Sequence, residues 1–504
     1  MTFTQHDIDL IMLHNKEVRM KVVVYDNSYQ SIGNITGRIK SVAMSVSSES
    51  EIRRTCTLTL VGVESGGSIS NSIEDEGVWF NRMAELSCGI YDSSINDYKW
   101  YPLGKMLIKD GGTNITATNY EIKLSMVDLM ASLMQERGSQ IGVDVVVPAG
   151  SVKKNALAAI IAEFSPFKRY SIPEFEDTVP YDIVTSSGSY PIDSLIGILE
   201  LTPYYEHYYD HEGVYVVAKI PTKIDDPIEV PRSIIDPLLI SENKSANLSS
   251  IKNTTEIWGR SLDAIYTALE CDSIGSIYNL YIDDTFKTLE EGSTYGFTPD
   301  STSSSGQAIK IQDSPEYQIY TQSGDGEYTL INKGALQQDI PYVVRYTNEM
   351  FVLQGELEIH VIVQEVTEMP SNEEQQRFKE NNACRDVQWI VNPDSPFAAT
   401  INGIGQISKE VRQVLQDGEY SNIYTTQLAF ERARYENWLK IRMQDTITLE
   451  MILIPWLDVN SKIEYTSPKT GEATVVIVQG IDYDFSKWTM TVKCAKFYPY
   501  YPWE

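Results

Sequence analysis

Strict alternation of apolar and polar residues is the feature that most constrains how this chain folds. In the stretch TCTLTL, Cys56, Leu58 and Leu60 fall on one side and the threonines between them fall on the other. The same period of two recurs in EIKLSM, ELEIHVIV and WTMTVKC. A strand with this pattern buries one face and exposes the other to water, as in antiparallel sheets and small barrels. We therefore predict a mainly β protein with some α (α+β).

Three segments carry helical spacing instead. The first contains NALAAIIAEF, which we expect Ser151 to cap and Pro166 to terminate. The second covers about 194–201 and ends before Pro203. The third is the longest, at about 421–443, and we expect its apolar face to pack within its own chain. That face carries Tyr424, Leu428, Tyr435, Trp438 and Leu439.

The length of 504 residues exceeds one ordinary hydrophobic core. Changes in composition divide the chain into four predicted domains. These are an N-terminal β-barrel domain at 1–148, a small α/β domain at 149–259, a β domain at 260–370, and a C-terminal β-barrel domain with a long helix at 371–504. The third of these domains holds a polar loop, TPDSTSSSGQ, which either contacts another protein or is simply a solvent loop.

The charge balance excludes one class of ligand. The net charge is −29, and a surface that negative repels phosphate. Nucleic acid is therefore not expected as a specific ligand, although DNA can pass through an acidic channel without sticking. No apolar run reaches the roughly 18 residues that span a bilayer, and the first residues lack the pattern of a signal peptide. We expect synthesis and assembly in a cytoplasm.

Cysteine usage and known motifs give no sign of catalysis. The five cysteines are scattered and include no Cys-x-x-Cys pair, which argues against a disulfide framework and against a zinc site. The chain has no phosphate-binding loop, no dinucleotide fingerprint, no His-Glu-x-x-His and no Gly-x-Ser-x-Gly. We predict that the protein is not an enzyme and uses no metal or other cofactor.

Two segments resemble metal sites, and for both we prefer another interpretation. HYYDHEG offers His207, Asp210, His211 and Glu212, but we interpret it as a solvated turn between a helix and a strand. His360 falls on the polar side of an alternating strand and needs no special role.

The second segment is DGGTNITATNYE, which has Asp110 first and Glu121 twelfth, as in a calcium loop. It has Ile115 where the sharp turn of that loop requires Gly. We therefore predict a β-hairpin there.

The C-terminal part of the chain resembles a known protein family. The runs YTTQLAFERARYENWLKIRMQDTITLEMILIPWLDVNSKIEY and TGEATVVIVQGIDYDFSKWTMTVKCAKFYPYYP are similar to the last domain of phage tail baseplate hub and tail-tip proteins. YKWYPLGKMLIKDG with NYEIKLSMVDLMASLM resembles their first domain, and IDSLIGILELTPYYEHYYDHEGVYVV resembles the block after it. Such proteins occur in phages, prophages and phage-tail-like bacteriocins of Gram-positive bacteria.

The resemblance implies a structural role in a virion. Such hubs are similar to the trimeric hub of contractile tails, in which two related β-barrels per subunit form a pseudo-sixfold ring. The resemblance implies that 1–148 and 371–504 are such tube-like β-barrel domains and that 260–370 is an inserted β domain. The expected partners are two further copies of the chain, the tail tube or distal tail protein above, and a spike, fibre or other baseplate protein below. Genome DNA is expected to pass during ejection without specific binding. The expected location is the virion tail baseplate, assembled in the host bacterial cytoplasm.

Two alternatives remain open at the level of sequence. One is a carbohydrate-binding tail-tip module, and the other is a cell-wall hydrolase. Relatives with wall-degrading activity carry a C-terminal extension, so we expect such activity to come from a partner. The aromatic residues proposed to contact a second subunit or a partner are Tyr424, Tyr435, Trp438, Tyr498, Tyr500, Tyr501 and Trp503.

Overall fold

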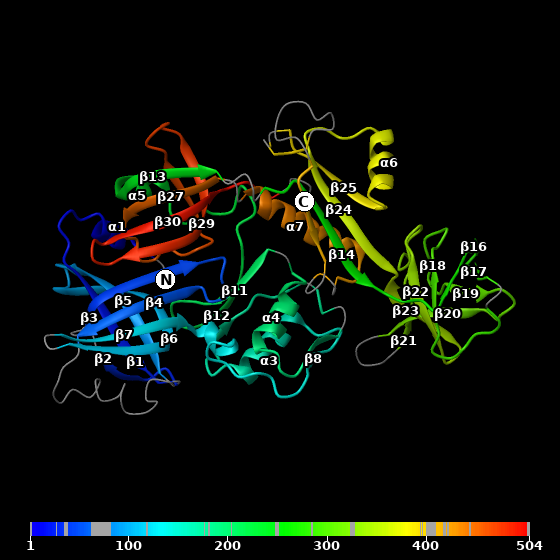
Figure 1. The fold of residues 1–504 in the computed structure, drawn as a ribbon, viewed down its shortest axis with the longest axis horizontal. Helices are drawn as coiled ribbons and strands as arrows, with labels where there is room; N and C mark the ends of the chain where they lie inside the picture. The colour runs from blue at the N-terminus through cyan, green and yellow to red at the C-terminus, as the bar shows by residue number, and fades with distance from the viewer. Residues whose placement is uncertain are drawn as a thin grey trace.

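The computed structural model describes residues 3–500 except 27, 35–38, 62–81, 117–118, 176, 180–181, 203, 247–250, 284–285, 323–327, 394, 396, 400–409, 417–419, 421–422 and 443–444. The fold is mainly β with some α and has several domains, as predicted (Figure 1). In the described part, no helix is both long enough and apolar enough to cross a membrane.

The first part of the chain folds into antiparallel strands preceded by one short helix. Its elements are α1 (Gln5–Ile11), β1 (Val18–Tyr25), β2 (Ser31–Asn34), β3 (Ile39–Ser47), β4 (Arg54–Val61), β5 (Met83–Asp92), β6 (Asp97–Thr116) and β7 (Asn119–Asp128). In β4 the side chains of Cys56, Leu58 and Leu60 are all buried, as the alternation predicted. The β6–β7 hairpin covers the calcium-like segment and confirms the hairpin prediction.

The last part of the chain adds strands to the same sheet. Its elements are β27 (Asp445–Ile452), β28 (Lys462–Thr466), β29 (Ala473–Asp484) and β30 (Thr489–Lys496), joined by β13 (Leu239–Ala246) and α5 (Arg232–Leu238) from the middle of the chain. The order is β13-β27-β30-β29-β3-β4-β7-β6-β5-β1-β2, with β28 on β29, which makes a 12-stranded sheet. The two parts meet where β29 pairs with β3.

One apolar core runs through both parts of this sheet. It contains Leu58 and Leu86 from the first part and Leu449, Val478 and Val492 from the last part. Burying these side chains together opposes separation of the two parts, because each is almost fully removed from water. The two parts therefore form one continuous wall, at the left of Figure 1.

The second block lies beside this wall and carries short helices. Its elements are η2 (Leu129–Leu133), β8 (Val145–Val147), α3 (Lys153–Phe164), β9 (Tyr170–Ser171), β10 (Ile183–Thr185), α4 (Pro191–Leu199), β11 (Tyr205–Tyr209) and β12 (Tyr215–Lys219). Helix α3 starts with Val152 as its N-cap and has no side-chain cap, so the prediction that Ser151 caps it is wrong. Helix α4 begins earlier than predicted because Pro191 suits the first helical turn.

A four-stranded sheet links this region to the far end of the molecule. It consists of β14 (Thr254–Ser261), β24 (Glu358–Val366), β25 (Asp386–Val391) and β26 (Arg412–Leu415), with helices α6 (Asn372–Asn381) and α7 (Thr426–Arg442). Helix α7 packs on β24 and β14. Because this packing covers one face and a polar cluster covers the other, every residue of β24 after Glu358 is buried. The prediction that this strand has one wet face is wrong.

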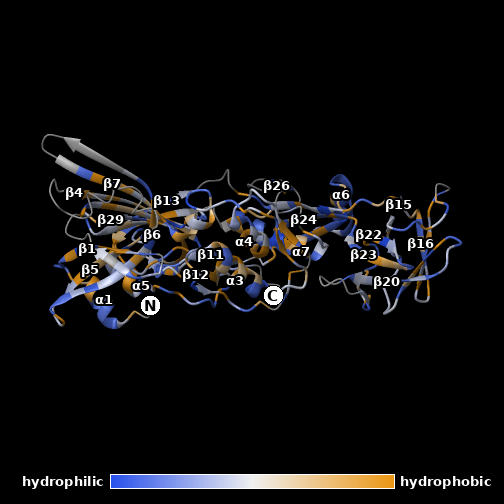
Figure 2. Cartoon of the chain, turned by 90° about the horizontal axis from the view of Figure 1, so that it is seen from below, coloured by the Kyte–Doolittle hydropathy of each residue, from blue (hydrophilic) through white to orange (hydrophobic). Residues whose placement is uncertain are grey.

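A separate unit is inserted between β14 and β24. Its strands are β15 (Tyr266–Thr267), β16 (Glu270–Ile274), β17 (Ile277–Tyr281), β18 (Thr294–Phe297), β19 (Ala308–Ile311), β20 (Tyr317–Gln322), β21 (Tyr328–Leu330), β22 (Tyr342–Thr347) and β23 (Met350–Glu356). They form a nine-stranded sheet with its own apolar core. Figure 2 shows an elongated molecule, with this unit at the end opposite the 12-stranded sheet.

Candidate functional site at the junction of three blocks

Two consecutive arginines lie where three blocks of the chain meet. These are the first block (α1 to β7), the second block (η2 to β12) and the last block (β27 to β30). Arg53 and Arg54 precede and begin β4, and both side chains are only 4% exposed. A buried charge is stable only when it is paired and hydrogen-bonded. The partners of these two arginines therefore show what the junction connects.

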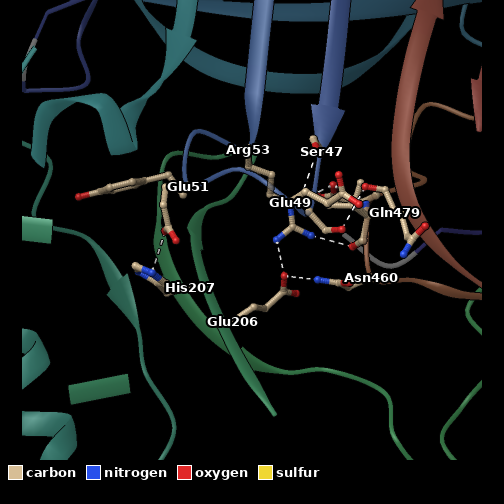
Figure 3. Close-up of polar contacts among 12 residues, drawn as sticks. Ser47, Glu49, Glu51, Arg53, Glu206, His207, Asn460 and Gln479 are labelled. Carbon is tan, nitrogen blue, oxygen red and sulfur yellow. Dashed lines mark hydrogen bonds and ion pairs between the residues drawn. The ribbon is translucent and has the colours of Figure 1, made fainter. Parts of the chain in front are cut away.

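Arg53 joins all three blocks (Figure 3). Its Nη1 donates to Oε2 of Glu206 in β11 at 3.1 Å, and its Nη2 donates to the carbonyl oxygen of Val459 at 2.7 Å. The guanidinium also lies 3.7 Å from the ring centre of Tyr208. Asn460 donates to the same oxygen of Glu206, so the carboxylate is held from two sides. Burial nevertheless raises the pKa of Glu206, because the charge of Arg53 only partly offsets the loss of water.

Arg54 forms a second set of contacts across the junction. Its Nη1 donates to the carbonyl oxygen of Tyr209 at 2.9 Å, and its Nη2 pairs with Asp458. Burial alone would raise the pKa of Asp458, but the charges of Arg53 and Arg54 lower it. The backbone N–H of Arg54 donates to Oδ2 of Asp128 at 2.9 Å. Burial raises the pKa of Asp128 to about 6.

The segment HYYDHEG, which we predicted to be a solvated turn and not a metal site, lies at the same junction. His207 is in strand β11, with its Nε2 3.1 Å from Oε2 of Glu51 and its Nδ1 3.1 Å from the hydroxyl of Tyr215. Asp210 accepts from the backbone N–H groups of Glu212 and Val214 and so forms the turn between β11 and β12. The polar turn is confirmed, but it connects two strands rather than a helix and a strand. Among the described residues, no three His, Cys, Asp or Glu side chains are grouped to hold a metal ion.

The predicted aromatic contacts divide into three groups. Trp438 is 1% exposed and donates from Nε1 to the carbonyl oxygen of Tyr498 at 3.0 Å, and Tyr500 is 9% exposed. The ring centres of Tyr435 and Tyr500 lie 5.1 and 4.9 Å from that of Tyr204. These residues therefore join α7 and the C-terminal segment to the second block.

Tyr424 lies apart from this aromatic cluster, beside the inserted unit. Tyr501 and Trp503 lie outside the described residues. A role of any of these aromatic residues in binding a second subunit or a partner remains a prediction.

Sequence reasoning missed the arginines and a second buried cluster. Arg54 has the same parity as Cys56, Leu58 and Leu60, so the alternation already placed it on the inward face. No comparable signal marks His360, which the sequence assigned to a wet face. Its ring stacks on Trp258 at 3.7 Å, and its Nε2 lies 2.9 Å from Oε1 of Glu256. The prediction of a wet face is wrong, because His360 is buried in a polar cluster, and the prediction that it needs no special role stays a prediction.

The junction has the chemistry of a rigid connector. Each arginine is held by partners from different blocks, which fixes the angles between the blocks. A hollow of about 400 Å³ beside Arg53, lined in part by Glu51, His207 and Tyr435, leaves space next to these contacts.

Comparisons with known proteins give the following findings. A family model described as a domain of unknown function (DUF5048) matches residues 394–501. No curated protein matches the sequence. Among solved structures, the chain is similar to a tail protein from Neisseria meningitidis MC58, with a TM-score of 0.48, 8% identity, and coverage of 96% of this chain and 98% of that one.

Two further solved structures are prophage proteins. The tail protein of prophage MuSo2 from Shewanella oneidensis gives a TM-score of 0.48 at 10% identity, covering 95% of this chain and 98% of that one. The prophage tail protein gp18 from Listeria monocytogenes EGD-e gives a TM-score of 0.39 at 7% identity, covering 94% of each chain.

Proposed function

We propose that this protein is the structural baseplate hub of a phage or phage-like tail. Three copies form a ring that joins the tail tube to the tail tip, spike or receptor-binding apparatus. The observation that carries the proposal is the continuous sheet, in which β3 near the start of the chain pairs with β29 near its end. The segments that resemble hub proteins in sequence supply strands on both sides of this pairing.

The ends of the sheet supply a way to build a ring. In the described sheet order the terminal strands are β13 and β2, so each presents one edge without a neighbouring strand. Free strand edges pair readily with other chains, and natural proteins blunt or cover them. Strand β13 carries Lys244, which pairs with Glu242, and an exposed Ile240. Contact between unlike edges of neighbouring copies is heterologous, which is the kind of contact that closes a ring.

The charge of the chain suits a channel for DNA. With a net charge of −29, an acidic lining repels phosphate and lets the genome pass without binding. A strongly basic lumen in an assembled ring would contradict this part of the proposal.

Labelling of intact particles tests the hub proposal. Gold-conjugated antibody against the chain should mark the distal end of the tail in electron micrographs, and particles from a strain that lacks the gene serve as the control. Label along the tail shaft or on the head would overturn the proposal. Peptidoglycan hydrolysis by the purified chain, lost on substitution of one carboxylate, would favour the hydrolase alternative instead.

A further inference from the structure

A large groove lies between the inserted unit and the face formed by α7 and β25. Its volume is about 990 Å³, which is at the upper end for ligand sites. One wall comes from β20, β23 and the segment 335–342, and the other comes from β25 and the start of α7. Arg385 donates to the carbonyl oxygen of Asp339 and so bridges the two walls.

The lining of the groove is rich in neutral amides. Five glutamines line it, and each amide offers both a hydrogen-bond donor and an acceptor. They are Gln322, Gln337, Gln354, Gln388 and Gln427. The charged side chains in the lining are Glu356, Asp386 and Arg434, which give a formal net charge of only −1 because two acids face one base. This composition suits a neutral ligand with many hydroxyl groups.

Aromatic rings lie among these amides. Tyr424 and Phe430 line the wall at the start of α7, and Tyr342 lines the opposite wall. Sugar rings have apolar faces and hydroxyl edges, so they are bound by aromatic faces together with planar amides and carboxylates. An extended peptide added to β25 would instead need pockets for alternate side chains, but Asp386, Val387 and Gln388 supply one small apolar residue between two polar ones.

Two residues of the lining carry polar atoms without protein partners. Oε1 of Gln388 and Nε of Arg434 are buried and make no hydrogen bond within the described part of the chain. Buried polar atoms in folded proteins are nearly always paired, so such exceptions call for an explanation. Rotation of the Gln388 amide toward a bound ligand would supply the missing hydrogen bond.

A contact between the two walls also fixes the shape of the groove. Glu356, at the end of β23, accepts from the backbone N–H of Thr426 at 3.2 Å and from its hydroxyl. This contact fixes the start of α7 against the inserted unit and sets the width of the groove. We propose that the groove is a binding site for a neutral oligosaccharide, a function separate from the hub role and independent of it.

Calorimetric titration of the full chain with a panel of neutral oligosaccharides tests the proposal. The panel contains tetrasaccharides of glucose, galactose and N-acetylglucosamine at millimolar concentration. The variant Gln337→Ala/Gln427→Ala removes one exposed amide from each wall and should weaken binding about tenfold, as expected for the loss of two hydrogen bonds. Tyr424→Ala should weaken it further by removing an aromatic face.

The matched control is Tyr281→Ala, which removes a 45% exposed tyrosine from β17, outside the groove lining. It should bind as the unchanged chain does. Saturable binding that survives in the groove variants would place the site elsewhere and overturn the proposal. Absence of binding across the panel, or binding of extended peptides in place of sugars, would also overturn it. The labelling of particle tails would be unaffected by any of these outcomes.

Discussion

The three-block junction is closed by buried arginines paired across its parts, whereas the junction of the inserted unit leaves an open groove. At the first, Arg53 and Arg54 are almost completely buried and paired across blocks. At the second, the inserted unit is attached through β14 and β24, and a groove of about 990 Å³ remains open beside it. The strand pair itself is anchored by the buried cluster around Glu256.

The two junctions therefore differ in rigidity. Buried ion pairs fix one geometry, because any movement leaves a charge without a partner. An open polar groove has no such penalty and leaves space for a ligand. This difference agrees with the two proposals, in which the 12-stranded wall forms the ring and the groove beside the inserted unit binds an oligosaccharide.

The largest loss of stability is expected for Arg53→Met. The substitution leaves Glu206 buried without its cation and should lower the free energy of unfolding by about 3–5 kcal/mol. Urea denaturation followed by tryptophan fluorescence measures it. The control is Lys487→Met, which breaks a pair whose side chains are 74% and 39% exposed and should change stability by less than about 1 kcal/mol. Equal effects of the two variants would remove the basis of the comparison.

A smaller effect is expected for Glu256→Gln at the base of the inserted unit. The Glu256 carboxylate accepts from Arg412 at 2.6 Å and from Trp258 at 2.9 Å, so the amide should cost about 1–3 kcal/mol at pH 7. Burial alone would raise the pKa of Glu256, but the hydrogen bonds from Arg412, His360 and Trp258 lower it.

The sign of this shift predicts the pH dependence. A carboxyl group with a lowered pKa stabilises the fold above its unfolded value of about 4.5, and the contribution is lost as pH falls below that value. The difference between Glu256→Gln and the unchanged chain should therefore shrink on acidification. A difference that grows toward low pH would contradict the assigned network.

Excision of the inserted unit should have a still smaller effect on the stability of the rest of the chain. Ser261 and Glu358 are paired neighbours on β14 and β24, so Asn-Gly in place of 262–357 closes a two-residue hairpin. We expect a loss of about 1 kcal/mol, because the start of α7 loses its contact with Glu356. Thermal unfolding followed by circular dichroism measures it. Failure of the shortened chain to fold would show that the unit is part of the scaffold.

The smallest effect is expected for Glu51→Gln at the edge of the arginine junction. The hydrogen bond with His207 lowers the pKa of Glu51, so the pair stabilises the fold above pH 4.5 and loses this contribution below it. Since Glu51 is 43% exposed, solvent screens the pair, and the loss should be about 0.5 kcal/mol at pH 6. Paired urea titrations at pH 6 and pH 4 test this, and a loss that is as large at pH 4 would exclude the ion pair.

Local periodicity predicted the strands well and the connections between them poorly. The alternation in TCTLTL and WTMTVKC was enough to place β4 and β30, because each strand has one buried face. The pairing of β3 with β29 depends on residues such as Ser45 and Asp482, which are 437 positions apart. No local pattern carries that information.

The sites were harder to predict than the strands, for two physical reasons. Only the parity of Arg54 in β4 gave a local signal of burial, whereas Arg53 and the His360 cluster are removed from water by tertiary packing alone. The groove is lined by residues within 321–322, 335–356, 386–388 and 424–434, which come together only in the fold. In the metal-like segment, the predicted polar turn is present after Tyr209, but His207 lies in strand β11, which was missed because tyrosines and charged residues mask the alternation.

Electron cryo-microscopy of intact tails tests the central claim most directly. The hub account predicts three copies of the chain around the tail axis at its distal end, with the 12-stranded sheets lining the channel and the inserted units pointing away from it. A single copy, or copies placed away from the distal end, would contradict the account.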